Sequence, residues 1–303
     1  MKRSAFTLVE LLVVITVIVL LVAMLIPAVS AAREYARRNQ CLTQQRSLAI
    51  AMVTHDKDSD GLPGYLNQLG TTPLRSWVVS ILPMIGENKR YEFMMEDPPV
   101  PDNVAQAVVP LFSILCPSDS PEENARLNYV VNCGPVAGHF PVSNGGDIAP
   151  HFTLFKDRRR SNPNDLTSIN KKVKIEDISD GASNTILLTE NVDAGVWHQG
   201  WASVLDELPT SALIPTRDSN AVANLGFVWV PYWAAPALQA AYTPNFAAKG
   251  PRPSSKHPGI VIAAFADGSA RAVNDSISQK EWFKFVCPDD IKAEDSFANG
   301  GLR

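Results

Sequence analysis

Three aspartates at alternate positions are the first candidates for chemistry in this 303-residue chain. Asp56, Asp58 and Asp60 precede Gly61, and this spacing matches the first half of a calcium-binding loop of the EF-hand type. The twelfth position of such a loop falls on Asn67, which cannot act as the bidentate glutamate ligand. We therefore interpret the aspartates as an acidic turn that ends a helix, with a calcium site as the alternative. No other cofactor is expected.

A histidine and an aspartate near the C-terminus form a second candidate, because His257 is followed after nine residues by Asp267 and Gly268. Histidine and aspartate often act together in catalysis. However, residues 260–266 read as a strand, Asp267-Gly268 is typical of a type I′ hairpin turn, and residues 269–273 read as the returning strand. Asp267 is then a turn residue, and the sequence contains no recognised nucleophile, zinc-protease or phosphate-binding motif. We expect no enzymatic activity.

Four cysteines, Cys41, Cys116, Cys133 and Cys287, are the third candidate group. An even number of cysteines in an exported domain permits disulfides. Four cysteines allow three pairings, and their spacing does not choose among them.

Glu10 lies at the start of a long apolar stretch, since residues 11–29 contain no charged side chain. About 20 apolar residues in a helix span the ~30 Å core of a bilayer, and Lys2 and Arg3 ahead of the stretch favour a cytoplasmic N-terminus. A carboxylate deep in a membrane costs roughly 2.5 kcal/mol or more, so such a residue usually has a partner. The alternative is a plain membrane anchor whose Glu10 side chain reaches back to the interface.

The helix is expected to continue beyond the membrane, because residues 30–55 contain neither glycine nor proline. We predict one helix from about residue 6 to about residue 55, bent at Pro27 and on the order of 75 Å long. Its second half should pack an apolar stripe on a globular domain. The stripe is expected to comprise Ala31, Tyr35, Leu42, Leu48, Ala49 and Met52.

The sequence after the long helix, residues 56–303, predicts an α+β domain with an antiparallel sheet. Strands are expected at 111–115, 128–132, 152–155, 186–190, 260–266 and 269–273, a short helix at 76–85, and a helix or strand at 276–285. Trp229, Tyr232 and Trp233 are interpreted as core, with sugar or peptide binding as the alternative. The net charge of −4 gives no basic face for nucleic acid.

The N-terminus resembles that of type IV prepilins and pseudopilins. The matching residues are Ala5, Phe6, Thr7, Leu8, Val9 and Glu10, ahead of the apolar stretch. The resemblance implies that a prepilin peptidase cuts between Ala5 and Phe6 and methylates the new amine of Phe6. It also implies that Glu10 pairs with the amine of a neighbouring subunit, and that Pro27 is the usual helix-bending proline. Prepilins usually carry glycine before the cut, where this chain has Ala5.

Further segments resemble a large bacterial family of prepilin-like proteins with a domain of unknown function. They are residues 41–52, Ser76-Trp77 with Leu82-Pro83, residues 115–119, residues 180–185 and the H-x(9)-D-G pattern of His257, Asp267 and Gly268. Cys41 and Cys116 both fall in shared segments, so the resemblance implies that these two form a disulfide.

Together these inferences divide the chain into a leader (1–5), a transmembrane half-helix (6–30), an exposed half-helix (31–55) and an extracytoplasmic globular domain (56–303). We expect a single-pass protein of the inner membrane whose partners are the prepilin peptidase and other pilin-like subunits. The expected role is a structural subunit of a type IV pilus or of a type II secretion-like pseudopilus. The alternative is a membrane-tethered ligand-binding domain.

Overall fold

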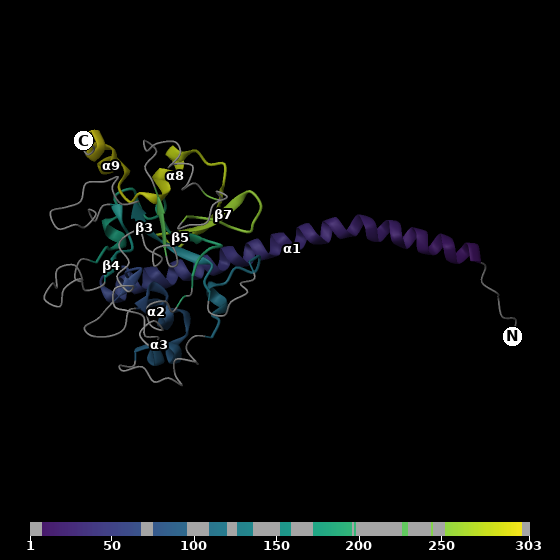
Figure 1. Ribbon diagram of the computed structural model, residues 1–303, viewed down its shortest axis with the longest axis horizontal. Helices are drawn as coiled ribbons and strands as arrows, with labels where there is room; N and C mark the ends of the chain where they lie inside the picture. The colour runs from purple at the N-terminus through teal and green to yellow at the C-terminus, as the bar shows by residue number, and fades with distance from the viewer. Residues whose placement is uncertain are drawn as a thin grey trace, which may run out of the picture.

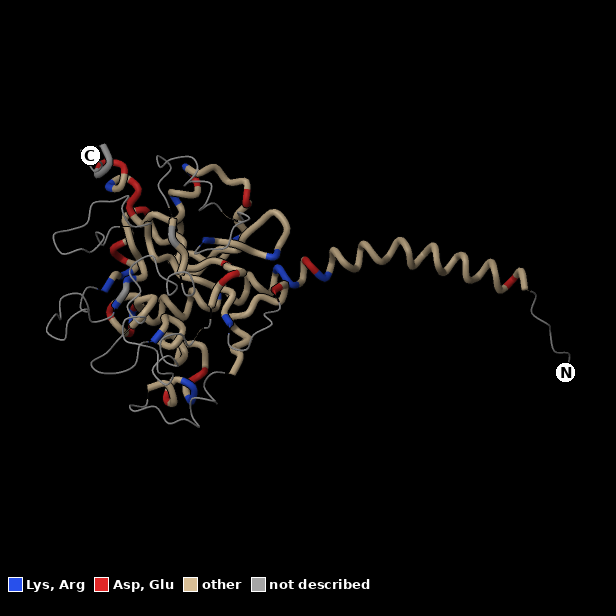
Figure 2. Tube along the Cα trace, viewed as in Figure 1, with Lys and Arg blue, Asp and Glu red and all other residues tan. Residues whose placement is uncertain are grey.

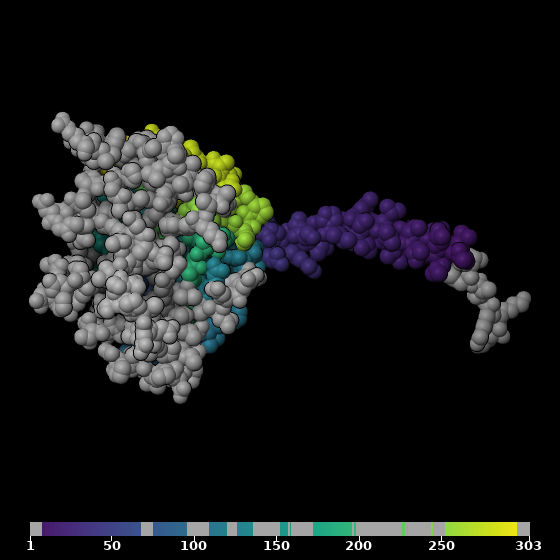
Figure 3. Space-filling view, in the orientation of Figure 1, coloured from purple at the N-terminus to yellow at the C-terminus, as the bar shows by residue number. Residues whose placement is uncertain are grey.

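One long helix projects from a domain that gathers around its second half (Figures 1 and 3). This computed structural model describes residues 8–67, 75–95, 109–119, 126–135, 152–158, 172–195, 197, 226–229, 244 and 252–298. The described elements form an α+β fold, as predicted, with two sheets and several short helices around the long one.

The projecting helix, α1 (Leu8–Ser59), has 52 residues and is therefore about 78 Å long. The helix continues through Pro27 without interruption, and its projecting part is gently curved (Figure 1). It also ends four residues later than expected. There Asp60, with φ 58°, leaves the right-handed helical region, and the amide of Gly61 donates to the Asp56 carbonyl at 2.8 Å. This left-handed ending is a common way to stop a helix.

The two halves of α1 have different surroundings. Its N-terminal half is exposed on all sides, and its most apolar 18-residue window has mean hydropathy 3.2 with none of it buried. Figure 2 shows no charge along the projecting part between Glu10 and the charged residues where the helix enters the domain. Ala31 and Tyr35, expected in the buried stripe, are exposed, because the fully buried positions of α1 begin only at Cys41. The buried residues are Cys41, Gln45, Leu48, Ala49, Ala51, Met52 and His55.

The main sheet has the strand order β6-β3-β5-β7-β8. Neighbours are antiparallel except for β6 and β3, which are parallel, so the predicted antiparallel sheet is correct apart from one pair. The helix α1 packs on β7, β8 and β5, and Gln45 Nε2 donates to the Ile262 carbonyl at 3.0 Å. The bounds are β3 (Tyr129–Pro135), β5 (Ile186–Glu190), β6 (Gly226–Trp229), β7 (Ile260–Phe265) and β8 (Ala270–Asn274).

Smaller elements complete the domain. A second sheet joins β2 (Arg75–Ser76), β1 (Leu66–Asn67) and β4 (Asp157–Arg158), and the helices α2 (Trp77–Ile81), η1 (Leu82–Ile85) and α3 (Asn88–Met95) follow β2. The short turns η2 (Phe112–Ile114) and η4 (Ile175–Asp177) lie in the connections, and α8 (Gln279–Val286) and α9 (Asp290–Ala298) close the chain. In Figure 1 the strands β3 and β5 lie between α1 and α8.

Two predicted strands are wrong. Residues 111–115 contain the single helical turn η2, closed by the Ile114 amide on the Leu111 carbonyl at 3.1 Å. Pro110 and Pro117 flank this segment, and neither can donate to a neighbouring strand. Residues 152–155 form no strand either, although Phe152, Leu154 and Phe155 are buried.

The predicted type I′ turn is also wrong. The Gly268 amide donates to the Phe265 carbonyl at 3.0 Å and the Phe265 amide donates to the Ser269 carbonyl at 2.8 Å, so three residues form the loop between β7 and β8. Only Gly268 in this loop has a positive φ, at 82°. This is the three-residue hairpin loop in which glycine follows a turn of ordinary handedness.

Asn132 joins three elements inside the core. It is fully buried, and its Nδ2 donates to the carbonyls of Ile186 in β5 at 3.0 Å and Val286 in α8 at 2.7 Å. Its Oδ1 accepts from the indole Nε1 of Trp229 in β6 at 3.1 Å and from the Gly134 amide at 3.1 Å. The buried Trp229 is thus part of the core, as interpreted, whereas Tyr232 and Trp233 lie outside the described residues.

Replacing this amide is expected to weaken the whole domain. Asn132→Ala should lower the free energy of unfolding by about 3 kcal/mol, because it leaves buried donors and acceptors without partners. The measurement is urea unfolding of the full chain in detergent, followed by tryptophan fluorescence. Asn39→Ala, at an exposed position of α1, is the control and should change stability by no more than about 0.5 kcal/mol. Equal effects of the two substitutions would contradict the role assigned to Asn132.

Candidate functional site

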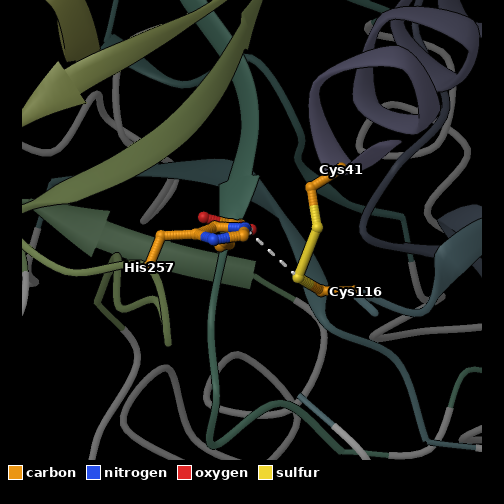
Figure 4. A group of neighbouring side chains, drawn as sticks. Cys41, Cys116 and His257 are labelled. Carbon is orange, nitrogen blue, oxygen red and sulfur yellow. Dashed lines mark hydrogen bonds and ion pairs between the residues drawn. A yellow bond between two sulfur atoms is a disulfide. The ribbon is translucent and has the colours of Figure 1, made fainter. Parts of the chain in front are cut away.

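A cluster of polar and sulfur-containing side chains lies where α1 enters the domain. Glu34 and Cys41 come from α1, Cys116 and Ser118 from the segment after η2, Glu190 from the end of β5, and His257 from the loop before β7. Figure 4 shows the His257 ring facing the Cys41–Cys116 bond. Four segments that are distant in the sequence therefore meet at one point.

A disulfide joins Cys41 to Cys116, with the two Cα atoms 5.5 Å apart. This is the pairing that the family resemblance implied. It ties α1 to the segment after η2 across 75 residues of sequence. Closing a loop of this length stabilises the folded chain by about 4 kcal/mol in the chain-entropy treatment.

The His257 imidazole is held between two carboxylates. Its side chain is 1% exposed; Nδ1 lies 2.6 Å from Glu34 Oε1, and Nε2 lies 3.4 Å from Glu190 Oε1. Nε2 is also 3.5 Å from the Cys116 Sγ. Burial lowers the pKa of His257, but its interactions with Glu190 and Glu34 outweigh burial, and the pKa lies above its ordinary value. The ring is therefore suited to bridge α1 and β5 as an imidazolium.

The segments around His257 are fixed by hydrogen bonds of their own. The Ile262 amide donates to Glu190 Oε2 at 3.0 Å. Ser118 Oγ donates to both Glu34 carboxylate oxygens at 3.3 Å. The Cys116 amide donates to Asn128 Oδ1 at 3.0 Å, which holds the cysteine beside the helix. Each side chain of the cluster thus has its position set by a neighbouring strand or loop.

The geometry does not make His257 and Asp267 a catalytic pair. They lie before and after β7 and are roughly 20 Å apart along the strand. Asp267 is exposed, and its Oδ1 accepts from the Ser269 amide at 2.8 Å. Ser118 Oγ approaches His257 Nδ1 to 3.5 Å, but Glu34 Oε1 is nearer to the same nitrogen. The cluster therefore has the geometry of a clamp between helix and sheet.

The three aspartates of the calcium alternative do not converge. Asp56 and Asp58 still belong to α1, where residues two apart point in different directions. Asp56 Oδ1 accepts from the Ile175 amide at 3.2 Å, and Asp60 Oδ1 pairs with Lys174 Nζ at 2.6 Å. Asp56 and Asp60 therefore hold the end of α1 against the segment at η4. The three aspartates do not form the loop that an EF-hand requires.

The sites expected at the N-terminus are only partly described. Ala5 and Phe6 lie outside the described residues. Glu10 lies in the exposed first turn of α1. It precedes Glu34 by 24 residues, so about 36 Å of helix separates it from the junction.

Sequence reasoning missed Glu34, Ser118 and Glu190 as members of the cluster. Glu34 looks like one of several charges on an exposed helix, and it contacts His257 across 223 residues of sequence. Glu190 carried a usable signal, because a charged residue at the end of the apolar run ILLTE needs a buried partner. Ser118 lies beside Cys116 in a segment already singled out.

The comparisons with known proteins identify two families. Residues 30–280 match the family described as "Protein of unknown function (DUF1559)". The chain belongs to this family. Residues 1–26 match the prokaryotic N-terminal methylation motif, so the protein is also prepilin-like and, with α1, membrane-anchored. No curated protein and no solved structure matches.

Another segment of this DUF1559 chain, residues 180–185, supports the C-terminal helix. The Asp290 amide at the start of α9 donates to Asp180 Oδ2 at 2.7 Å, and the Asp180 amide donates to the Pro288 carbonyl at 3.3 Å. Burial, together with the charges of Asp289 and Asp290, raises the Asp180 pKa to about 6. The carboxylate is therefore unfavourable in the folded state at neutral pH.

We expect Asp180→Asn to stabilise the protein at pH 7.5 by about 1 to 2 kcal/mol, allowing for solvent screening. The folded pKa exceeds the ordinary value of 3.8, so protonation of Asp180 adds stability as pH falls through about 6 and the gain is complete below about 4. The difference between variant and wild type should therefore shrink on acidification. Urea unfolding at several pH values measures this difference in unfolding free energy. Asp267→Asn, at an exposed turn, is the control. A pH-independent difference would contradict the shift.

Because His257 lies between Glu34 and Glu190, replacing it should strongly destabilise the folded protein. His257→Leu should lower the free energy of unfolding by about 3 kcal/mol or more, because it leaves the buried Glu190 carboxylate without a cation. Arg37→Ala removes the more exposed partner of Glu34, 3.7 Å away, and should cost no more than about 0.5 kcal/mol. Urea unfolding of the full chain compares them, and similar losses would show that His257 carries no buried charge pair.

Proposed function

We propose that this protein is a structural, non-enzymatic subunit of a type IV pilus or of a type II secretion-like pseudopilus. A prepilin peptidase processes it, the N-terminal half of α1 anchors it in the inner membrane as a single pass, and it assembles with other pilin-like subunits. The N-terminus faces the cytoplasm and the globular domain is extracytoplasmic. The observation that carries the proposal is the half-uncovered helix: an apolar stem with one carboxylate near its start, joined to a folded domain.

The uncovered half of α1 supports assembly as well as anchoring. A domain with a plain tether needs only a membrane span and a linker, whereas here one helix continues from the apolar stem into the domain core. The disulfide and the Glu34–His257 contact lie at the junction and fix the direction of the stem relative to the domain. A fixed stem can pack against identical stems at a constant angle, as a filament of helical subunits requires.

Processing would place a positively charged group near Glu10. Cutting between Ala5 and Phe6 leaves a positively charged, methylated amine four residues before Glu10, about one helical turn away. Each charge alone is costly near the hydrocarbon layer. A charge pair between adjacent helices lowers that cost and sets their stagger, because the two groups lie one turn apart along each helix.

Changing Glu10 is therefore expected to separate insertion from assembly. Glu10→Gln should insert in the membrane and lose its leader as the wild type does, since Ala5-Phe6 is unchanged, but should crosslink to neighbouring subunits at least tenfold less. The measurements are crosslinking in membranes and the mass of the mature chain. Thr16→Val, a change of an uncharged polar residue in the same stem, is the control. Wild-type crosslinking by Glu10→Gln would overturn the pilin-type assembly.

The alternative function, a membrane-tethered ligand-binding domain, is favoured by one cavity of about 220 Å³. Its lining combines basic residues from α1, β2 and β4 with apolar residues from α2, η1 and α3, which suits an anion with an apolar part. The lining residues are His55, Ser59, Asn67, Arg75, Val79, Ser80, Pro83, Met84, Tyr91, Met95 and Arg158. Normal assembly of Glu10→Gln would favour this alternative.

A further inference from the structure

The clamp at the helix–domain junction has the composition of a metal centre. One ligand atom from each of Cys41, Cys116, Glu190 and His257 lies within 4.8 Å of the other three. All four residues are buried, and they come from four different segments of the chain. Two sulfurs, an imidazole and a carboxylate are ligands that Zn²⁺ accepts in tetrahedral sites. As long as the two sulfurs form a disulfide, however, neither can act as a thiolate ligand.

We propose that the reduced protein binds one Zn²⁺ ion through Cys41, Cys116, His257 and Glu190. Reduction adds two electrons and two protons to the Cys41–Cys116 bond and gives two thiols; a dithiol reductant supplies both and becomes a disulfide itself. Binding of Zn²⁺ then releases the two thiol protons and the Nε2 proton of the His257 imidazolium, and it leaves two thiolates and a neutral imidazole on the metal. Zinc in the reduced protein thus joins the same elements that the disulfide joins in the oxidised one.

The spacing of the ligand atoms suits this exchange. Metal–ligand bonds of roughly 2.0–2.3 Å place neighbouring ligands of a tetrahedral zinc about 3.3–3.8 Å apart. His257 Nε2 already lies 3.4 Å from Glu190 Oε1 and 3.5 Å from the Cys116 Sγ. Breaking the sulfur–sulfur bond allows the two cysteine side chains to separate to the same spacing.

The Glu190 carboxylate has one buried oxygen that can bind a metal ion. Its Oε2 accepts from the Ile262 amide at 3.0 Å, whereas its Oε1 is buried, makes no well-formed hydrogen bond and faces His257 Nε2. A buried carboxylate oxygen requires a donor or a cation. In the oxidised protein the imidazolium provides the charge, and in the reduced protein Zn²⁺ replaces the proton on Nε2 and binds both Nε2 and Oε1.

Glu34 acts as a positioning residue for this site. Its Oε1 lies 2.6 Å from His257 Nδ1, so it holds the proton on Nδ1 and turns Nε2 toward the metal position. A carboxylate on the outer nitrogen is a frequent partner of zinc-binding histidines, and its loss typically weakens metal binding by about 10–100-fold. The Ile262 amide fixes Glu190 in the same way.

The test is cobalt and zinc titration of the full chain, purified in detergent with a phosphine reductant present throughout. The reduced chain should bind one Co²⁺ with the intense visible bands of a tetrahedral site and a thiolate charge-transfer band, and Zn²⁺ should displace it. The oxidised chain, in which Cys41 and Cys116 form the disulfide, should show neither the tetrahedral visible bands nor the thiolate charge-transfer band. Circular dichroism is the control that checks whether the reduced chain stays folded.

Variants separate this site from adventitious binding. Cys41→Ser and Cys116→Ser should each abolish the charge-transfer spectrum of the tetrahedral site, and Glu34→Gln should weaken Co²⁺ binding by about 10–100-fold. Cys133→Ala and Cys287→Ala remove the two other cysteines and should leave the titration unchanged. A folded, reduced chain without the tetrahedral bands, or a Cys41→Ser variant that retains them, would overturn the proposal. None of these readouts depends on subunit assembly.

Discussion

The structure depends on a change of surroundings along one continuous helix. The first half of α1 is exposed on every side and carries no charged side chain between Glu10 and Arg33, whereas from Cys41 onward one face is buried in the domain. Hydrophobic burial alone does not set this boundary, because the exposed stem is strongly apolar, whereas the buried residues of α1 include Gln45 and His55. The boundary is instead fixed by directional contacts, the Glu34–His257 ion pair and the Cys41–Cys116 bond, which lie two helical turns apart on α1.

Polar side chains also fix how the sheet meets its helices. Gln45 contacts the Ile262 carbonyl, Glu190 accepts from the Ile262 amide, and Asn132 joins β3, β5, β6 and α8. Each of these hydrogen bonds can form only when the helix and the strand are aligned in one way. A buried polar group left without a hydrogen-bond partner costs about 1–3 kcal/mol. Apolar contacts supply most of the driving force for folding, whereas these bonds select one docking geometry. A defined stem direction is the property that the proposed filament role requires.

Local sequence patterns predicted the elements whose cause is local. The run from Leu8 to Ser59 lacks glycine and has one proline, so a long helix was predictable, and the apolar stretch before Asp267-Gly268 marked the hairpin of β7 and β8. The turn type was not predictable, because Ala266 joins the loop only through the Phe265–Ser269 pairing. The parallel pairing of β6 with β3 and the contact of His257 with Glu34 depend on tertiary packing, for which one sequence carries no periodic signal.

The H-x(9)-D-G spacing gains a physical meaning from the way β7 lies along α1. His257 contacts Glu34, and five residues later the Ile262 carbonyl accepts from Gln45. A turn from His257 to Ile260 leads into β7, and in it the Ile260 amide donates to the His257 carbonyl at 3.5 Å. At the far end of β7 the backbone of Gly268 lies against the Ile50 side chain, where an added Cβ would approach to 3.3 Å. Histidine and glycine therefore anchor the two ends of one strand to one helix. Their separation reflects the length of that strand, and a one-residue change within it would turn the strand's buried face away from α1.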